Sequence, residues 1–291
     1  MRYWLISVLI CLSLTSLQGQ TLSEKIALIA CERLDSIDNF ETLQDSIQPS
    51  ITAAMATVMM KGTLEERKQI GTVEGIRGTL KKALEILPSR CYNVRRLIIE
   101  SKRKVFYKES ENLKANAHFD KGNEYMEKED YKSARKEFES AIKLDEKFVY
   151  AFDHLAISYR RQNNYKSAIS YYKKSLDIFP EGDVALLNIA VCYSFLLDKE
   201  STMKYYDQIK YLYPNNPEGY YGAAKFLFIN ADYENALDNL FISHRIYSEN
   251  KSTLSNDSQK LIELFYSKLK ELNQLDLFDR KAKEYGITIE R

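Results

Sequence analysis

The sequence predicts an all-α protein in which a small helical domain precedes a solenoid of helical hairpins. Two observations support this prediction: the chain becomes self-similar with a period of about 34 residues, and apolar side chains recur at helical spacing. The composition agrees, because 291 residues with 45% hydrophobic side chains, 10 Gly and 5 Pro exclude disordered and collagen-like chains. A net charge of +1 gives no global field that would hold a polyanion, so we expect neither nucleic acid nor an anionic membrane as a partner unless the charge is locally concentrated.

Residues 1–19 have the layout of a secretory signal peptide. Arg2 precedes an apolar run from Leu5 to Leu17, and a small residue, Gly19, follows that run. The run is shorter than the roughly 20 residues that a spanning helix needs. We therefore expect an exported protein, periplasmic or secreted, with no transmembrane segment after the signal is removed.

Residues 20–114 lack the repeat but still read as helical, and we expect them to form a small N-terminal helical domain. Thr21 and Thr63 each stand three residues before a glutamate, which is the pattern of a helix capping box. A basic run from Arg90 to Lys108 has two interpretations. It contacts an acidic surface, or it is the solvated face of an amphipathic helix, and the second is favoured.

Three cysteines remain once the signal is removed, in a compartment where disulfides persist. Cys31 and Cys91 both fall in the N-terminal domain, whereas Cys192 lies in a helix of the repeats, so we expect a disulfide between Cys31 and Cys91. The alternative is that all three are small buried apolar residues. There is no CxxC pair and the histidines are far apart, so we expect no metal site.

Small side chains mark the repeat, because two helices pack closely only where both backbones can approach. Each unit has one small residue in its first helix and another in its second helix. In chain order these residues are Gly122, Ala156, Ala190 and Ala224 in the first helices, and Ala134, Ala168, Thr202 and Ala236 in the second helices. The expected units are residues 115–148, 149–182, 183–216 and 217–250, and we expect residues 251–291 to form capping helices.

This pattern resembles the tetratricopeptide repeat family over residues 115–250. In that family the first helix of each unit lines a concave groove that holds a peptide or another protein. The resemblance assigns the groove to fixed positions of each unit. The expected partner-binding residues are Tyr150, Ile157, Arg160, Arg161, Val184, Leu187, Val191, Phe195, Tyr221, Lys225 and Phe228.

Two positions depart from the clamp with which some members of the family hold an acidic C-terminal peptide. Asp153 and Val184 stand where that clamp needs cations or amides, so we do not expect a chaperone-tail ligand. The apolar positions suit the anchors of an amphipathic or extended segment instead. The rival interpretation is that the chain's own C-terminal helix or N-terminal domain covers these apolar residues.

The sequence contains none of the motifs that commonly carry catalysis. It has no G-x-S-x-G elbow, no phosphate-binding loop and no H-E-x-x-H pair, so we expect no enzyme activity and no cofactor. The expected function is that of a protein–protein interaction scaffold or assembly factor in the cell envelope. The alternative is binding of a small apolar or glycan ligand between the N-terminal domain and the repeats. The identity of the partner and the oligomeric state stay open.

Overall fold

The computed structural model describes residues 21–287, which form fifteen α-helices and no strand. The all-α prediction is confirmed. The expected signal peptide, residues 1–19, lies outside the described residues. None of the described helices is both long enough and apolar enough to cross a bilayer. The chain divides into two compact units, one ending at Ile98 and the other beginning at Ile99. This division lies before the boundary at residue 114 that the sequence suggested.

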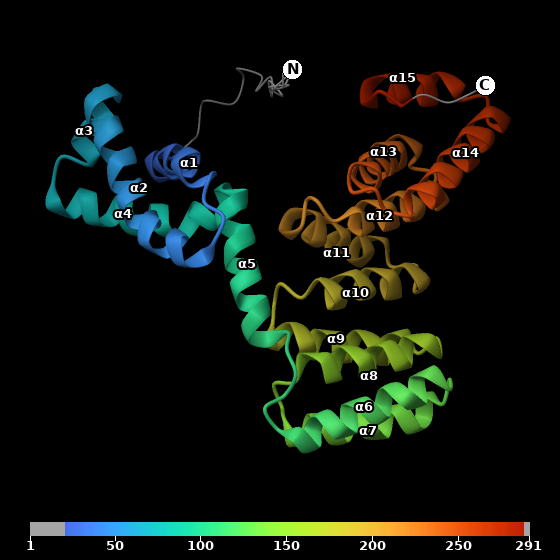
Figure 1. The fold of residues 1–291 in the computed structure, drawn as a ribbon. Coiled ribbons are helices and arrows are strands. Elements are labelled where there is room, and N and C mark those ends of the chain that lie inside the picture. Colours follow the sequence, from blue (N-terminus) through green and yellow to red (C-terminus); the bar gives the residue numbers. More distant parts are fainter. Residues whose placement is uncertain (1–20, 288–291) are drawn as a thin grey trace, which may run out of the picture. The chain divides into compact units, whose positions relative to one another are not determined.

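Unit 1 is a bundle in which the first helix packs against two others. Its helices are α1 (Leu22–Leu34), α2 (Phe40–Lys61), α3 (Leu64–Gln69) and α4 (Val73–Arg90), followed by the first half of α5 (Tyr92–Phe106) (Figure 1). Helix α1 contacts both α2 and α4, and its buried apolar residues fill the space between them. Thr21 and Thr63 form the expected capping boxes, which satisfy backbone N–H groups at the starts of α1 and α3.

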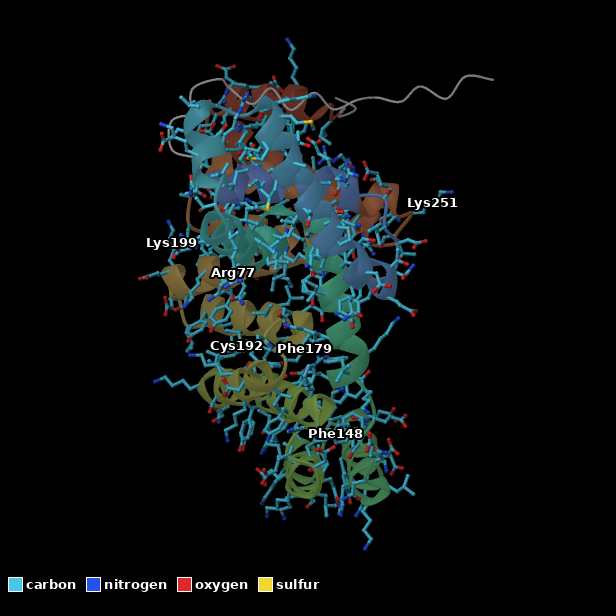
Figure 2. The ribbon with its side chains drawn as sticks, turned by 90° about the vertical axis from the view of Figure 1, so that its left-hand side faces the viewer. Arg77, Phe148, Phe179, Cys192, Lys199 and Lys251 are labelled. Carbon is cyan, nitrogen blue, oxygen red and sulfur yellow. A yellow bond between two sulfur atoms is a disulfide. The ribbon has the colours of Figure 1, made fainter. Side chains whose placement is uncertain are left out.

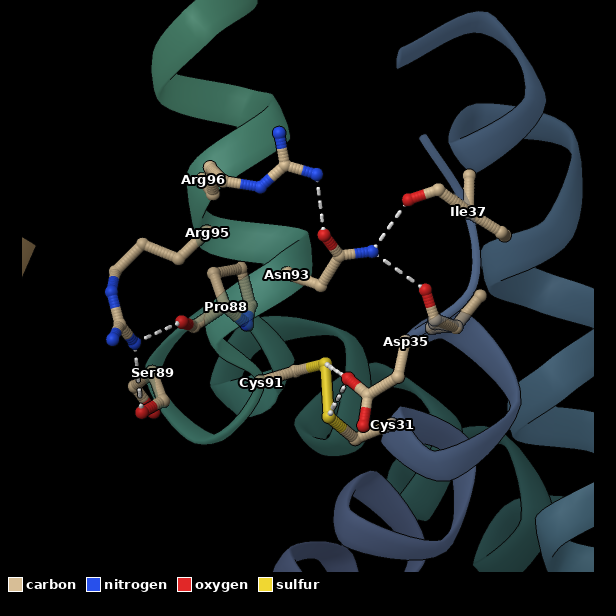
Figure 3. The surroundings of a disulfide bond; sticks show 10 residues. Cys31, Asp35, Ile37, Pro88, Ser89, Cys91, Asn93, Arg95 and Arg96 are labelled. Atoms are coloured by element: carbon tan, nitrogen blue, oxygen red, sulfur yellow. Dashed lines mark hydrogen bonds between the residues drawn. A yellow bond between two sulfur atoms is a disulfide. The ribbon is translucent and has the colours of Figure 1, made fainter. Parts of the chain in front are cut away.

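A disulfide joins Cys31 on α1 to Cys91 at the end of α4, the pairing expected from the positions of the cysteines in the sequence. The two Cα atoms are 5.4 Å apart. Beside it, the side-chain amide of Asn93 donates hydrogen bonds to the carbonyl oxygens of Leu34 (2.8 Å) and Ile37 (2.7 Å) (Figure 3). These bonds satisfy carbonyl groups at the end of α1, so the covalent link and the polar link hold the same junction.

Unit 2 is a stack of antiparallel helix pairs (Figure 1). Each expected repeat forms one pair, and the helices are α6 (Leu113–Glu127) with α7 (Tyr131–Leu144), α8 (Val149–Arg161) with α9 (Tyr165–Ile178), α10 (Asp183–Phe195) with α11 (Lys199–Leu212), and α12 (Pro217–Ile229) with α13 (Tyr233–Glu249). The last two helices are α14 (Ser255–Glu271) and α15 (Leu275–Tyr285). Their side chains Phe265 and Phe278 are buried in one core with α12 and α13, which makes them the end cap that a solenoid needs.

The turn between the two helices of each pair has the same backbone conformation in all four repeats. Glu129, Asn163, Leu197 and Ala231 all take the left-handed conformation, with φ between 58° and 60°. In the first three pairs the next residue is Asp or Asn, and its side chain accepts a hydrogen bond from a backbone N–H of the second helix. This bond is an N-cap, so a local sequence signal sets the start of each second helix.

Close packing within a pair depends on the small residues that revealed the repeat. In the first pair, a Cβ atom at Gly122 would overlap the ring of Phe138, which is fully buried. In the third pair Thr202 replaces the usual alanine; it is buried and its hydroxyl donates to the carbonyl of Asp198 at 2.7 Å. The hydroxyl is therefore satisfied, and the substitution costs the core no unpaired polar group.

Candidate partner-binding face

The predicted groove residues lie on α8, α10 and α12, the first helices of successive repeats; we call them the candidate binding face. These helices contact one another directly, which brings their side chains onto neighbouring positions. Ile157 is half-buried against a core shared by α8, α9 and α10, and Leu187 against one that includes α10 and α12. Val191 is also half-buried, while Arg161 and Lys225 are exposed. The face is thus an apolar strip with cations beside it.

The beginning of this face is covered by residues just after α5. The ring of Tyr107 lies edge-on to the ring of Tyr150, with centroids 4.3 Å apart. The Tyr107 hydroxyl donates to a carboxylate oxygen of Asp153 at 3.0 Å, and the Tyr150 hydroxyl donates to the Tyr107 carbonyl at 3.3 Å. The structure therefore places Tyr150 against the chain's own backbone.

The second half of α5 is held to the repeats by charge and by aromatic packing. Arg103 pairs with Asp183 at 2.6 Å, and Lys102 pairs with Glu181 at 2.6 Å. The preferred interpretation of the basic run, a solvated face, is wrong for these two residues, because each contacts a carboxylate at the α9–α10 junction. The ring of Phe179 at the same junction, labelled in Figure 2, is fully buried and stacks against Phe106 with centroids 6.1 Å apart.

Asp153 is the most perturbed carboxyl group of this covered end. Its side chain is only 1% exposed, and this burial raises its pKa from 3.8 to about 7. The hydrogen bond from Tyr107 acts in the opposite direction, and the nearby Asp183 carboxylate adds to the rise. Burial also raises the pKa of the Tyr107 hydroxyl far above its ordinary value, so this tyrosine stays a donor.

The far end of the face is covered by the cap. The ring of Phe228 stacks on the ring of Phe265 from α14, with centroids 3.6 Å apart and planes 12° from parallel. Phe228 also meets Tyr233 edge-on, with centroids 5.2 Å apart. Phe228 therefore serves the internal core, which agrees with the rival interpretation that the C-terminal helices cover part of the face.

The remaining predicted residues differ in what they touch. Arg160 is half-buried beside the hydroxyl of Tyr172 and the thiol of Cys192. Burial raises the pKa of the Cys192 thiol to about 11, and Arg160 opposes that rise, so the thiol is protonated and inert at neutral pH.

Tyr221 meets Tyr247 edge-on, with centroids 6.0 Å apart, and Lys225 lies over the Tyr221 ring at 5.5 Å. Val184 is half-buried, and its carbonyl accepts a hydrogen bond from Asn188.

Exposed apolar residues lie at the helix turns of the third and fourth repeats, and one of them, Leu197, was missed by reasoning from the groove positions alone. Leu197 is 83% exposed and Ile229 is 79% exposed, beside Phe195 at 60%. Phe195 stacks on Tyr165 of the preceding repeat, with centroids 4.9 Å apart. The signal that would have found Leu197 is its place in the repeat, because the second repeat has a polar residue, Asn163, there.

Within residues 21–287, one group of side chains has the composition of a metal site, namely Cys31, Asp35 and Cys91. Both cysteines of that group are joined in the disulfide, so neither has a thiolate to bind a metal ion in the oxidised protein. The candidate binding face offers apolar area, two exposed cations and tyrosine rings. That combination suits recognition of another polypeptide.

Comparison with known proteins places the repeats in a family. Models of the tetratricopeptide repeat match residues 115–148 and 149–181, and a further tetratricopeptide model matches residues 184–216. These are the first three helix pairs; the fourth pair lies outside the matched residues. No curated protein sequence matches the chain.

Solved structures with a similar fold include two forms of the MamA protein. One has a TM-score of 0.43 at 14% identity and covers 61% of this chain and 98% of its own; the other, MamA MSR-1 C2, scores 0.44 at 16% identity over 60% and 98%. The Cut9–Hcn1 hetero-tetramer of the APC/C scores 0.49 at 15% identity, covering 87% of this chain but 48% of the matched one. The family models match the first three helix pairs, so residues 115–216 of this chain consist of tetratricopeptide repeats.

Proposed function

We propose that the protein is a non-enzymatic scaffold or assembly factor of the cell envelope, which binds a peptide or helical segment of another protein. The tetratricopeptide repeats support a protein partner. The proposed export rests on the signal-like layout of residues 1–19. The binding site is the middle of the candidate binding face, between the end that Tyr107 covers and the end that Phe265 covers.

The observation that carries this proposal is the apolar strip left between those two ends. Ile157, Leu187 and Val191 are half-buried on neighbouring helices, so each retains apolar surface that a ligand can remove from water. Burial of such surface is worth about 25 cal/mol per Å². A strip of this kind anchors the ligand, and the charged residues at its edge, which we call the rim, orient the ligand.

The rim specifies the chemistry of the ligand. Arg161 lies at the end of α8 and is exposed, and Lys225 on α12 is exposed above the ring of Tyr221. Neither cation has an ion-pair partner within the described residues. A ligand with an apolar stripe and a carboxylate near each end of that stripe therefore matches the face in both pattern and charge.

A pull-down from the native cell envelope tests this proposal. The bait is the mature, disulfide-intact chain, compared with an Arg161→Glu, Lys225→Glu variant and with a Val191→Glu variant. We expect the same protein to co-purify with the wild type and to be reduced at least fivefold with either variant. Phe228 is left unchanged, because its contact with Phe265 is internal and its loss would disturb the cap.

The matched control is Lys132→Glu with Lys166→Glu, which makes the same change of charge on exposed residues of second helices. This control should retain the partner, and circular dichroism should show native helix content in every variant. Capture of the same partner by all variants would place the interface elsewhere on the chain. Capture of no protein by the wild type, under conditions that preserve complexes, would remove the scaffold role.

A further inference from the structure

Unit 1 carries a concentration of exposed apolar side chains that its core does not use. They lie on α3 and the adjoining ends of α2 and α4, and we call them the apolar tip: Met59, Met60, Leu64, Val73 and Ile76. Met60 is 68% exposed, Leu64 71% and Val73 75%. Single exposed apolar residues are ordinary, but five within a short stretch of sequence indicate an interaction surface.

The backbone of the apolar tip is held in place by local contacts. The guanidinium of Arg67 donates to the carbonyl of Gly62 at 2.8 Å and to that of Met60 at 3.3 Å. At the other side of α3, Gly75 approaches the backbone of Gln69 so closely that no side chain fits there. These contacts tie the end of α2 to α3 and α3 to the start of α4. The apolar side chains are therefore presented by an ordered turn.

Unpaired cations accompany the apolar tip. Lys61, Lys68 and Arg77 are exposed, and none forms an ion pair with another residue of the described chain. Arg77 lies on α4, where Figure 2 labels it. Residues 59–82 contain six cations and three carboxylates, and one of these carboxylates, that of Glu66, is already paired with Lys25 at 2.6 Å. The local charge is positive although the whole chain is close to neutral.

Apolar residues mixed with lysines fit a lipid surface better than a protein. The core of a protein interface is depleted of lysine, because a strongly hydrated ammonium group is costly to bury there. At an anionic bilayer the same side chain is favourable: its stem lies along the apolar region while its charge reaches the phosphates. Methionine and leucine side chains enter the boundary between headgroups and acyl chains without needing a shaped pocket.

We infer that the apolar tip docks on an anionic membrane surface. Leu64 and Val73 enter the headgroup boundary, and Lys61, Lys68 and Arg77 contact lipid phosphates. This activity belongs to unit 1 and is separate from partner binding by the repeats. None of the described helices is long and apolar enough to cross a bilayer. Docking by the apolar tip would hold an exported chain at the membrane surface, where an envelope scaffold works.

Co-sedimentation with vesicles tests the inference directly. The mature, disulfide-intact protein is mixed with vesicles of phosphatidylethanolamine containing a quarter phosphatidylglycerol, and separately with vesicles of phosphatidylcholine. We expect binding to the anionic vesicles that weakens with added salt. A Leu64→Glu, Val73→Glu variant should bind roughly tenfold or more weakly, because two largely exposed apolar side chains no longer enter the lipid. A Lys61→Glu, Lys68→Glu variant should bind severalfold more weakly.

The control variant is Leu197→Glu with Ile229→Glu, which removes equally exposed apolar residues from the repeats and adds the same charge. It should bind vesicles as the wild type does. Three results would overturn the inference: no sedimentation of the wild type, equal loss in the control, or unchanged binding by the tip variants. A dimer that the Leu64→Glu, Val73→Glu change converts to a monomer, without vesicle binding by either form, would instead make the tip a protein interface.

Discussion

Replacing both Cys31 and Cys91 by serine should destabilise unit 1 by about 4 kcal/mol. The disulfide closes a loop with a sequence separation of 60 residues, and a chain-entropy estimate for a loop of that length gives about 4 kcal/mol at room temperature. The substitution removes one sulfur–sulfur bond at a junction that Asn93 continues to hold by two hydrogen bonds. The loss therefore comes mainly from the greater freedom of the unfolded chain, with little change in the folded contacts.

Hydrogen exchange followed by mass spectrometry measures this loss separately in each unit. Tryptophan fluorescence is unsuitable, because the single tryptophan, Trp4, falls in the expected signal peptide. In the variant, the slowest amides of α1, α2 and α4 should exchange about a thousandfold faster, which is the factor that 4 kcal/mol gives. The amides of α8 and α10 should keep their wild-type rates, since they belong to a unit with its own core.

Two results would refute this reasoning. An increase of less than about tenfold in α1 and α4 would mean that the unfolded chain already keeps the two cysteines near each other, so that the loop entropy in the estimate is not available. Equal acceleration in α8 and α10 would mean that the two units unfold together. Reduction of the wild-type protein, without mutation, is the control that separates loss of the bond from the effect of the serine side chains.

Three further substitutions test the repeats, and a fourth, in α4 of unit 1, is a control. Because burial raises the pKa of Asp153 from 3.8 to about 7, the folded chain keeps a proton that the unfolded chain releases above about pH 4. The stability that this proton gives the wild type is fully present below about pH 4 and is lost as the pH rises to about 7. The free energy of unfolding of Asp153→Asn, relative to that of the wild type, should therefore increase by about 3 kcal/mol from pH 5 to pH 8, as measured by thermal or urea unfolding at each pH. Leu197→Asn should raise the free energy of unfolding by about 0.5 to 1 kcal/mol, because Leu197 is left-handed and exposed and asparagine adopts that conformation more readily; a lower urea midpoint would contradict this. Gly122→Val should cost about 1 to 3 kcal/mol by crowding Phe138, while Gly78→Ala on α4, where a Cβ meets nothing within 4 Å, should be neutral or stabilising.

The repeat architecture was predictable because its causes are local. A small residue opposite an aromatic one, as at Gly122 and Phe138, acts over a short stretch of one helix pair and recurs in the next. The turn chemistry is equally local, with a left-handed residue followed by an N-cap. Disulfide pairing was predictable for a different reason. Outside the expected signal peptide, two cysteines share the N-terminal domain and the third, Cys192, lies in the repeats, where the structure buries it.

The contacts that cover the first end of the candidate binding face could not be read from the sequence. Tyr107 reaches Asp153 across 46 positions, and Lys102 reaches Glu181 across 79. Residues 99–107 do not belong to the repeat, so no periodicity relates them to the carboxylates that they meet. A basic run indicates only that some acidic or aqueous surface faces it. Which carboxylates it contacts depends on how the repeats stack, and that information is not local.

The two covered ends also limit the length of ligand that the face can hold. The open part of the face extends from Arg161 on α8 across α10 to Lys225 on α12, and neighbouring packed helices lie about 10 Å apart, so this part spans about 20 Å. A helix rises 1.5 Å per residue and an extended chain about 3.3 Å, which gives about 13 residues of helix or 6 of extended chain. Longer ligands gain no further contact on this face, because Tyr107 and Phe265 already occupy its ends. A short peptide from the partner should therefore compete with the whole partner protein, and failure of every such peptide would mean that binding extends beyond the strip.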